Sequence, residues 1–412
     1  MPPVTPPTAV VVGAGIGGLT AAAALRRVGW SVRVLERSPE PQPTGAGIVL
    51  LANAMRCLDE IGAGDAIRGL GAAAYPGGTR TASGRWLARV DAERVAARFG
   101  SGAVVIHRAQ LHDALAAVLG PDGVTYGAQV TDVEREPGPT PRALVRYLAG
   151  GTAQEVTGDV VVAADGAASA LRGRFWPGHA DLEYTGSTAW RAVASVPPGT
   201  VTEMSETWAP GGAFGIVPMA DGRVYWFATA LRPAGGREGD GAEELAEVRR
   251  LVAGWHDPIE AVLAATPPEA VLRHDISALR HALPSYVRGP VALVGDAAHA
   301  MPPNLGQGGS QAIEDGIVLA ASLATAAAPA EVRDGLARYD AQRRPRSQQV
   351  QRLSWAMARF GAQLRHPAAV ATRDAMVRIA PSAAVMRAAS RFAGWVPPSL
   401  AAAAGDAARG SA

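Results

Sequence analysis

Three short apolar runs, each followed directly by a turn that contains glycine or aspartate, dominate the hydrophobic pattern of the chain. The runs lie in Ala9–Val12, Asp159–Ala163 and Val291–Val294, and all are rich in valine. Continuous runs of this length predict strands buried on both faces, as in a parallel sheet covered by helices. Because ligands of such doubly wound sheets bind at the carboxyl ends of the strands, we expect an α/β fold whose three turns meet at one edge.

Apolar and aromatic positions alternate with polar ones between Tyr184 and Arg232, which predicts antiparallel strands joined by Gly and Pro turns. Trp and Tyr residues are concentrated there. There are two interpretations: either one aromatic face of the sheet lines a pocket for a flat apolar ligand, or the aromatic residues form the core of a sandwich. The residues alone leave both readings open.

The first apolar run opens the segment Thr8–Arg37, which has a strand, a GxGxxG turn, an Ala-rich helix and a second strand that ends at Glu36. This βαβ context predicts a dinucleotide site. Gly13 permits the tight turn, Gly15 leaves room for a pyrophosphate, and Gly18 allows the helix to pack closely on the strand. The motif does not separate FAD from NAD.

The other two turns favour FAD. Asp165-Gly166 follows the second run and Gly295-Asp296 follows the third, with Gly306–Gly309 at the start of a long helix. A carboxylate such as Asp296 accepts hydrogen bonds from a polyol, and a positive helix N-terminus suits a ligand that becomes anionic on reduction. FAD has a ribityl polyol between its rings, whereas NAD has none.

Composition narrows the chemistry. The chain has 412 residues, a formal net charge of +2 and no lysine, so all 39 basic residues are arginine. The absence of lysine excludes a lysine Schiff base and a P-loop lysine, and the small net charge implies no nucleic-acid partner. Cys57 is the single cysteine, which excludes an intramolecular disulfide, and we expect it to be buried. We see no metal motif, signal peptide or membrane span, so we expect a cytoplasmic protein.

In combination, these segments resemble the FAD-dependent aromatic hydroxylases with the para-hydroxybenzoate hydroxylase fold, the class A flavoprotein monooxygenases. The similarity extends over about residues 8–350. The matching segments, in order, are GAGIGGL with Glu36-Arg37, Arg108, VVVAADGAASALR, VALVGDAAHAMPPNLGQGGSQAIEDG and YDAQRRPR.

The resemblance implies roles for individual residues. It implies that Glu36 binds the adenosine ribose, Arg108 lies near the ribityl and pyrophosphate, and the backbone of Val130 contacts the adenine. Asp296 would hold the ribityl chain, and the Gly306–Gly309 backbone the isoalloxazine. The full set of expected cofactor-binding residues is Gly13, Gly15, Gly17, Gly18, Glu36, Arg37, Gly47, Arg108, Val130, Asp165, Asp296, Gly306, Gly308 and Gly309.

Asp165 and Arg108, and also His299 near Asp296, have simpler structural interpretations. Asp165 is also placed to cap a helix, and Arg108 to form a surface ion pair. We expect His299 to pack beside the cofactor rather than to act as a base.

The resemblance also implies a reaction. Non-covalently bound FAD would be reduced by NADH or NADPH as a transient co-substrate, would react with O2 to a C4a-hydroperoxide, and would hydroxylate an aromatic or polycyclic small molecule. We assign no catalytic acid or base to the protein. The candidates for the substrate pocket are Trp190, Arg191, Phe214 and Trp226, and Arg191 would bind a carboxylate or phenolate unless it forms an ion pair at the rim.

Other functions remain open at this point. An epoxidase or a Baeyer–Villiger oxygenase of the same fold would share all these motifs, as would a non-catalytic FAD-binding protein. A flavin halogenase is disfavoured because its catalytic lysine and WxWxIP segment are missing. An NAD dehydrogenase would leave the turns at Asp165 and Gly295 unexplained.

We therefore expect a Rossmann-like FAD-binding domain with an inserted β-sheet substrate domain and a C-terminal helical region. Residues 1–183 would form the first part of the FAD-binding domain, with 72–100 contributing to the substrate side. The remaining segments are 184–270 for the substrate sheet and helix, 271–328 for the second part of the FAD-binding domain, 329–400 for C-terminal helices and 401–412 for a disordered tail.

Overall fold

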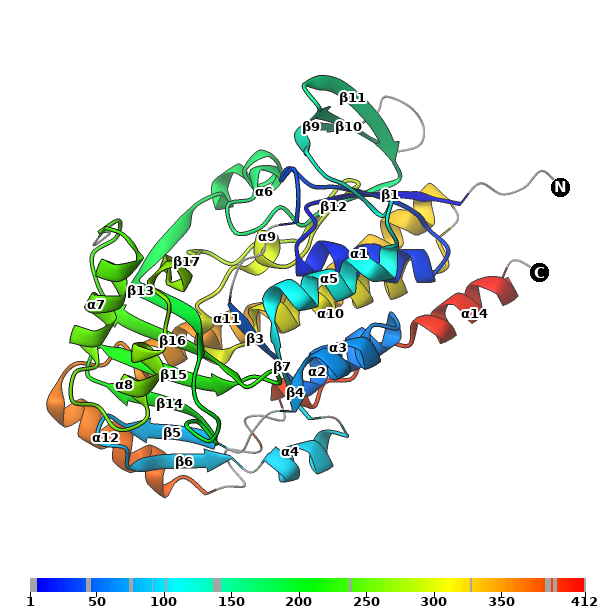
Figure 1. Ribbon diagram of the computed structural model, residues 1–412. Coiled ribbons are helices and arrows are strands. Elements are labelled where there is room, and N and C mark those ends of the chain that lie inside the picture. The colour runs from blue at the N-terminus through cyan, green and yellow to red at the C-terminus, as the bar shows by residue number, and fades with distance from the viewer. Residues whose placement is uncertain are drawn as a thin grey trace.

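The computed structural model describes residues 6–41, 46–73, 77–90, 92–100, 102–135, 142–236, 239–326, 328–381, 387 and 391–410. A six-stranded sheet forms the centre of one half of the molecule (Figure 1). Its strand order is β18-β19-β12-β1-β2-β8, and the four central strands run parallel. The strands are β1 Thr8–Val12, β2 Ser31–Leu35, β8 Val124–Thr125, β12 Val160–Ala163, β18 Val287–Arg288 and β19 Val291–Leu293.

The valine runs form the three neighbouring strands β1, β12 and β19, as expected, because both faces of the sheet are covered. Helices α1 and α10 lie together against one face, beside α5, and a small three-stranded sheet lies over the opposite side (Figure 1). The helices are α1 Ile16–Arg27, α5 Arg108–Leu119 and α10 Gly308–Leu323, and the small sheet is β9 Ala128–Arg135, β10 Ala143–Ala149 and β11 Thr152–Gly158.

A seven-stranded sheet dominates the other half of the molecule, with the order β17-β13-β16-β15-β14-β5-β6. We call it the substrate sheet. Helices α7 and α8 pack on one of its faces (Figure 1). The elements are β5 Gly77–Thr81, β6 Trp86–Val90, β13 Leu182–Ser195, β14 Met204–Ala209, β15 Gly212–Pro218, β16 Arg223–Leu231, β17 Leu272–Leu279, α7 Gly241–Leu251 and α8 Ile259–Ala264.

Strand membership differs in part from the expected segments. β5 and β6 come from within 72–100 and join the substrate sheet. β17 lies in 271–328, the segment assigned to the FAD-binding domain, but it pairs antiparallel with β13 at the edge of the substrate sheet. The return to the parallel sheet therefore occurs after Leu279, since β18 and β19 are the next strands.

A fourth sheet, with the three strands β3-β7-β4, connects the two halves. Helices α2 and α3 lie beside it, and α11 crosses behind the substrate sheet (Figure 1). The remaining bounds are β3 Gly47–Leu50, β4 Ala72–Ala73, β7 Val104–His107, α2 Ala52–Glu60, α3 Gly64–Leu70, α4 Ala92–Phe99, α6 Ala170–Phe175, α9 Asp296–His299, α11 Pro329–Phe360 and α12 Pro367–Ile379.

The expected disordered tail is wrong for most of its length. Leu400–Gly410 forms helix α14, which contacts α10 and α1. Leu400 is fully buried, and Ala403 and Ala404 pack against the main core. An Ala-rich segment is helical here because its apolar side chains find a surface to cover. None of the described helices is long and apolar enough to cross a membrane.

Candidate functional site

The turns after four parallel strands meet at one edge of the six-stranded sheet. β12 lies between β1 and β19, and β2 lies on the other side of β1. The backbone continues in register beyond the strands, since Ala164 N–H donates to Val12 O at 2.9 Å and Val294 N–H donates to Ala163 O at 3.0 Å. Glu36, Asp165 and Asp296, each just beyond its strand, therefore belong to one edge.

Two glycines allow the first turn to pack as it does. Gly13 has φ +101°, and a Cβ there would lie 2.5 Å from Ala164 O. A Cβ on Gly18 would collide with Gly13 O, so helix α1 sits directly on the turn. Gly17 packs against Ala312 of α10. By contrast, the space around Gly15 is open, at the unshielded N-terminus of α1, where backbone N–H groups favour an anion.

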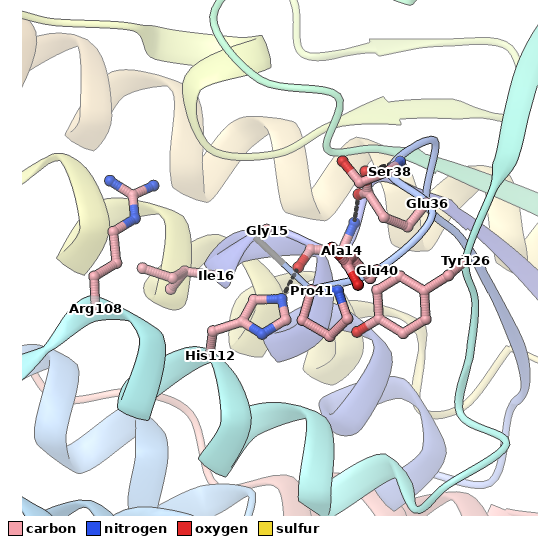
Figure 2. Close-up of a pocket in the computed structure, with 10 residues that line it drawn as sticks. All are labelled: Ala14, Gly15, Ile16, Glu36, Ser38, Glu40, Pro41, Arg108, His112 and Tyr126. Atoms are coloured by element: carbon pink, nitrogen blue, oxygen red, sulfur yellow. Dashed lines mark hydrogen bonds between the residues drawn. The ribbon is translucent and has the colours of Figure 1, made fainter. Parts of the chain in front are cut away.

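Glu36 and His112 hold this turn in place from two sides (Figure 2). Ala14 N–H donates to Glu36 Oε2 at 2.7 Å, and Ser38 N–H donates to Glu36 Oε1 at 2.9 Å. The imidazole of His112, on α5, donates from Nε2 to Ala14 O at 2.9 Å. Sequence reasoning missed His112. The signal would have been its position four residues after Arg108, on the same face of an expected helix.

A cavity of about 170 Å³ lies along this turn. Figure 2 shows Tyr126 and Pro41 near Glu36 at one end and Arg108 at the other, with Ile16 between them. The side chain of Arg108 is exposed and comes from the first residue of α5. The cavity is lined by Ala14, Gly15, Ile16, Glu36, Ser38, Glu40, Pro41, Arg108, His112 and Tyr126. Sequence reasoning missed Tyr126 as well, because the loop that carries it has no recognisable motif.

Arg37 and Val130 are among the expected contacts that do not line this cavity. The side chain of Arg37 is exposed, and Val130 is half-buried in β9, where it pairs with Tyr147. Their roles at the cofactor stay predictions.

The second and third turns present carboxylates. Leu171 N–H donates to Asp165 Oδ2 at 3.1 Å, so Asp165 does hold the start of a helix, but its Oδ1 is buried with no partner among the described groups. Asp296 begins α9 and is exposed at the edge of the sheet. Gly295 has φ +65°, which turns the chain so that Asp296 follows the buried strand directly.

The N-terminus of α10 offers a further polar surface. No described side chain caps it, Gly306 is left-handed with φ +61°, and no described atom lies within 4 Å of a Cβ built on Gly306 or Gly308. Near it, the Gln307 amide nitrogen, the Asn53 amide oxygen and the Ser310 hydroxyl are buried without partners in the described part of the chain. Free donors and acceptors beside an uncapped helix of 16 residues suit a polar, anionic ring edge, as a reduced flavin has.

Behind these turns lies a buried charged network. Arg343 of α11 donates to Asp315 Oδ1 at 2.7 Å and to Glu314 Oε2 at 2.5 Å. Asp315 Oδ2 accepts from Gly295 N–H at 2.9 Å and lies 2.6 Å from His299 Nε2. Burial opposes the charge of Asp315, but His299 and Arg343 outweigh it and lower its pKa. His299 is thus buried in a structural network behind the turn.

The substrate sheet has two different faces, and this overturns three pocket predictions. Trp190, Phe214 and Trp226 are at most 1% exposed and pack in one cluster under α7 and α8. Trp190 Nε1 donates to Glu244 of α7 at 2.6 Å, and Trp226 Nε1 donates to Thr266 at 2.9 Å. The expectation that these three aromatics line a pocket is wrong, because they form the core beneath the helices.

The opposite face of the substrate sheet points at the FAD-binding half. Alternation along β16 puts Tyr225 and Phe227 there, and pairing puts Arg191 beside Phe227. Tyr225 packs with Ala46 and Val105 of the other half. A Cβ on Gly47 would lie 2.5 Å from the Tyr225 ring, so Gly47 permits this close approach. We call this surface the flavin-side face.

Strand β3 joins this face to the N-terminus of α10. Gly47 lies against Tyr225, and Ile48 Cδ1 would lie 2.9 Å from a Cβ on Gly309. The flavin-side face and the open glycines of α10 are therefore separated by one strand. A planar ligand at α10 would have the substrate sheet as its neighbour.

Comparisons with known proteins agree with this site. A family model described as an FAD-binding domain matches residues 7–354. An aurachin C monooxygenase/isomerase of Stigmatella aurantiaca is 37% identical over 86% of this chain and 89% of its own length. A 2-heptyl-3-hydroxy-4(1H)-quinolone synthase of Pseudomonas aeruginosa (strain UCBPP-PA14) is 30% identical over 92% and 96%.

A solved structure, HpxO of Klebsiella pneumoniae complexed with FAD and uric acid, superposes with a TM-score of 0.85 and 27% identity, over 95% of this chain and 97% of that one. The predicted FAD-binding fold is thereby confirmed. The carboxylates, open glycines and unpartnered buried polar atoms at the sheet edge fit that cofactor. The chain belongs to the FAD-dependent flavoprotein monooxygenases, in the family of aromatic hydroxylases that share this FAD-binding domain.

Proposed function

We propose that this protein uses NADH or NADPH and O2 to hydroxylate a planar aromatic or heteroaromatic small molecule, held between the flavin-side face and the N-terminus of α10. The observation that carries the proposal is the short connection through β3, with Gly47 against Tyr225 and Ile48 against Gly309. The names of the relatives support a substrate of this kind, since they include a quinolone and uric acid.

In this proposal, the chain's own residues bind and orient the cofactor. Glu36 and the open backbone at Gly15 hold the adenosine and pyrophosphate, Asp296 the ribityl chain, and the Gly306–Gly309 backbone the flavin ring. FAD, when bound and reduced, activates O2 for the transfer of one oxygen atom to an electron-rich ring. The uncapped end of α10 stabilises negative charge on the ring that it holds, because helix N-termini favour anions.

Water exclusion is the second contribution of the chain. Tyr225 is 8% exposed and packs with Val217 and Met219, so the part of the face next to β3 is apolar. An apolar, tightly packed wall keeps solvent away from the reacting ring.

The test is anaerobic reduction of the FAD-loaded protein by NADH and by NADPH, with and without a panel of phenolic and N-heteroaromatic compounds. We expect at least one compound to accelerate bleaching of the flavin band. Under an atmosphere of ¹⁸O₂ in place of air, the same compound should gain one labelled oxygen, which mass spectrometry detects. The structure of the product decides between a hydroxylated ring and an epoxide or Baeyer–Villiger product.

Two outcomes would overturn the proposal. Flavin that stays oxidised with both donors and every compound would indicate a non-catalytic FAD-binding protein. Rapid reduction that yields only hydrogen peroxide, with no labelled product for any compound, would indicate an oxidase.

A further inference from the structure

One cross-strand row on the flavin-side face is polar at both ends and aromatic in the middle. Glu206 of β14 pairs with Gly215 of β15, Gly215 pairs with Phe227 of β16, and Phe227 pairs with Arg191 of β13. Directly paired residues share a face of the sheet. Met204, two residues before Glu206, packs against the same cluster as Phe227, the cluster that contains Tyr225, which places this row on the flavin-side face.

The middle of the row is aromatic, with the Phe227 ring tilted by 39° against that of Tyr225 in the neighbouring row. A Cβ on Gly215 would collide with the ring of Phe227, so that ring lies across the glycine, toward Glu206. The rings of Phe227 and Tyr225 are neighbours, with centroids 6.2 Å apart. A flat ligand can stack on such a surface.

The acidic end of the row is enclosed but still accessible. Trp208 Nε1 donates to Glu206 Oε1 at 2.9 Å, and no described group hydrogen-bonds to Oε2. Desolvation by the surrounding protein raises the pKa of Glu206, and it outweighs the hydrogen bond from Trp208, which lowers that pKa. The side chain nevertheless keeps part of its surface. Trp208 in turn packs edge-on against Phe360, at the end of α11, which closes this side.

The basic end of the row is Arg191, which has no partner among the described residues. Arg191 is half-buried, and within the described ranges no group hydrogen-bonds to it or forms an ion pair with it. Burial raises the pKa of the Tyr225 hydroxyl, whereas the positive charges of Arg191 and of Arg108, in the other half, act to lower it. A half-buried guanidinium with free donors is suited to an anionic or enolic oxygen.

The neighbouring row adds a third polar group. Thr229, two residues after Phe227 on the same strand and face, has a buried hydroxyl with no partner among the described groups. The side chains of Glu206 and Arg191 start roughly 14 Å apart, three interstrand spacings along the sheet. Because both side chains extend over the row toward each other, the remaining distance between the Glu206 carboxylate and the Arg191 guanidinium suits a fused two-ring system.

We infer that Glu206 and Arg191 are the specificity-determining residues of the substrate site, and that the substrate is a planar fused ring with an N–H on one edge and a carbonyl or enolate oxygen on the other. Glu206 Oε2 accepts from the ring N–H, Arg191 donates to the oxygen, and Phe227 supports the ring. This inference rests on the proposed function, since it names the substrate class of the same site.

The test is a binding titration of the oxidised, FAD-loaded protein, followed by the perturbation of the flavin absorbance band. The probes are 4(1H)-quinolone and 1-methyl-4(1H)-quinolone, which share the ring oxygen and differ in the N–H. We expect the wild type to bind the N–H compound about tenfold more tightly, the size of effect expected for one charge-assisted hydrogen bond.

The variant Glu206→Gln is informative because Trp208 still needs an acceptor. The glutamine keeps its Oε1 toward the Trp208 N–H, so its NH2 group replaces the accepting Oε2. The preference for the N–H probe should fall to about onefold in E206Q. If the methyl group were rejected only by its size, E206Q would keep the preference. R191M should weaken both probes by a similar factor, about tenfold.

Glu183→Gln and Arg280→Met are matched controls, because these two residues form an exposed ion pair away from the row. Both should bind the probes as the wild type does. Equal affinity of the wild type for the two probes, an unchanged preference in E206Q, or no response to either probe at ~1 mM would overturn the inference. Because the titration needs no NAD(P)H and no turnover, its failure is distinguishable from failure of the proposed monooxygenation.

Discussion

At the scale of single residues, the cofactor end of the site depends on side chains that shape the backbone. Glu36 accepts from the N–H groups of Ala14 and Ser38, and His112 donates to the carbonyl of Ala14. The glycine turn is thus fixed before any ligand binds. Preorganisation of this kind lowers the entropic cost of binding a long, flexible cofactor.

Replacing Glu36 with alanine should weaken FAD binding. E36A frees two backbone N–H groups and removes the carboxylate proposed to accept from the ribose, and a hydrogen bond to a charged group contributes about 1.5–3 kcal/mol. We expect the Kd for FAD to rise about 10- to 100-fold, measured by quenching of flavin fluorescence as apoprotein is added. Glu269→Ala, an exposed position away from the cavity, serves as the control. A Kd for E36A within about twofold of the wild type would argue against the assigned role.

At the scale of elements, the turn before α9 is held by contacts from α10 and α11. Asp315 of α10 accepts from Gly295 N–H, while Arg343 of α11 pairs with Asp315 and Glu314. All three charged side chains are at most 1% exposed. Breaking such a buried pair leaves an uncompensated charge, which is strongly destabilising. The long helix α11 therefore helps to position the turn before α9 through the charged side chains of α10.

This network predicts a pH dependence of stability. The folded-state pKa of Asp315 lies below its ordinary value, so its contribution is present above about pH 4 and is lost as the pH falls through the folded-state pKa. We expect D315N to lower the free energy of unfolding by about 3–5 kcal/mol at neutral pH. The difference from the wild type should shrink as the pH is lowered to about 3, measured by urea unfolding.

Asp181→Asn provides the control for this series, because Asp181 is exposed. Its unfolding curves should follow those of the wild type at every pH. A D315N difference that stays constant through the acid range would show that the carboxylate is not charged in the folded protein.

At the scale of the whole molecule, the site depends on how closely the two halves approach. The contact runs through Gly47, whose missing side chain lets the Tyr225 ring lie against β3. The same strand places Ile48 beside Gly309, at the end of α10. Gly47 and the Tyr225 ring thus contribute to the close approach of the substrate sheet to β3 and the start of α10.

A methyl group at Gly47 should force the halves apart. G47A overpacks the contact with Tyr225, and overpacking costs about 1–3 kcal/mol. We expect the free energy of unfolding of G47A to fall by that amount in urea titrations. In a Y225L background the same substitution should cost less, because the ring that it meets is gone, and this coupling is measured by a double-mutant cycle.

Gly69→Ala is the matched control, since Gly69 lies in helix α3 with open space around it. It should leave stability unchanged or raise it slightly, because alanine favours helix. Equal costs of G47A with and without the Tyr225 ring would contradict the proposed contact.

Local sequence patterns were sufficient to predict the fold of the FAD-binding half. Valine runs become buried parallel strands because no polar side chain interrupts them, and in-register parallel strands bring their turns to one edge. The packing roles of Gly13 and Gly18 could thus be predicted from their positions in the motif, whereas the roles of Glu36 and Asp296 at the cofactor stay predictions. The fold class, the FAD motifs and the burial of Cys57 likewise follow from local sequence patterns.

The division of the substrate sheet into two different faces depends on tertiary packing. Trp226 and Tyr225 are adjacent aromatics on one strand, and alternation sends them to opposite faces. Which face meets the flavin depends on helices α7 and α8, which cover the Trp226 side, and these lie far along the chain. Glu206 and Arg191 come from different strands, so their shared row follows from pairing, which no local pattern records. The helix at 400–410 likewise depends on Leu400 finding a buried site against distant elements.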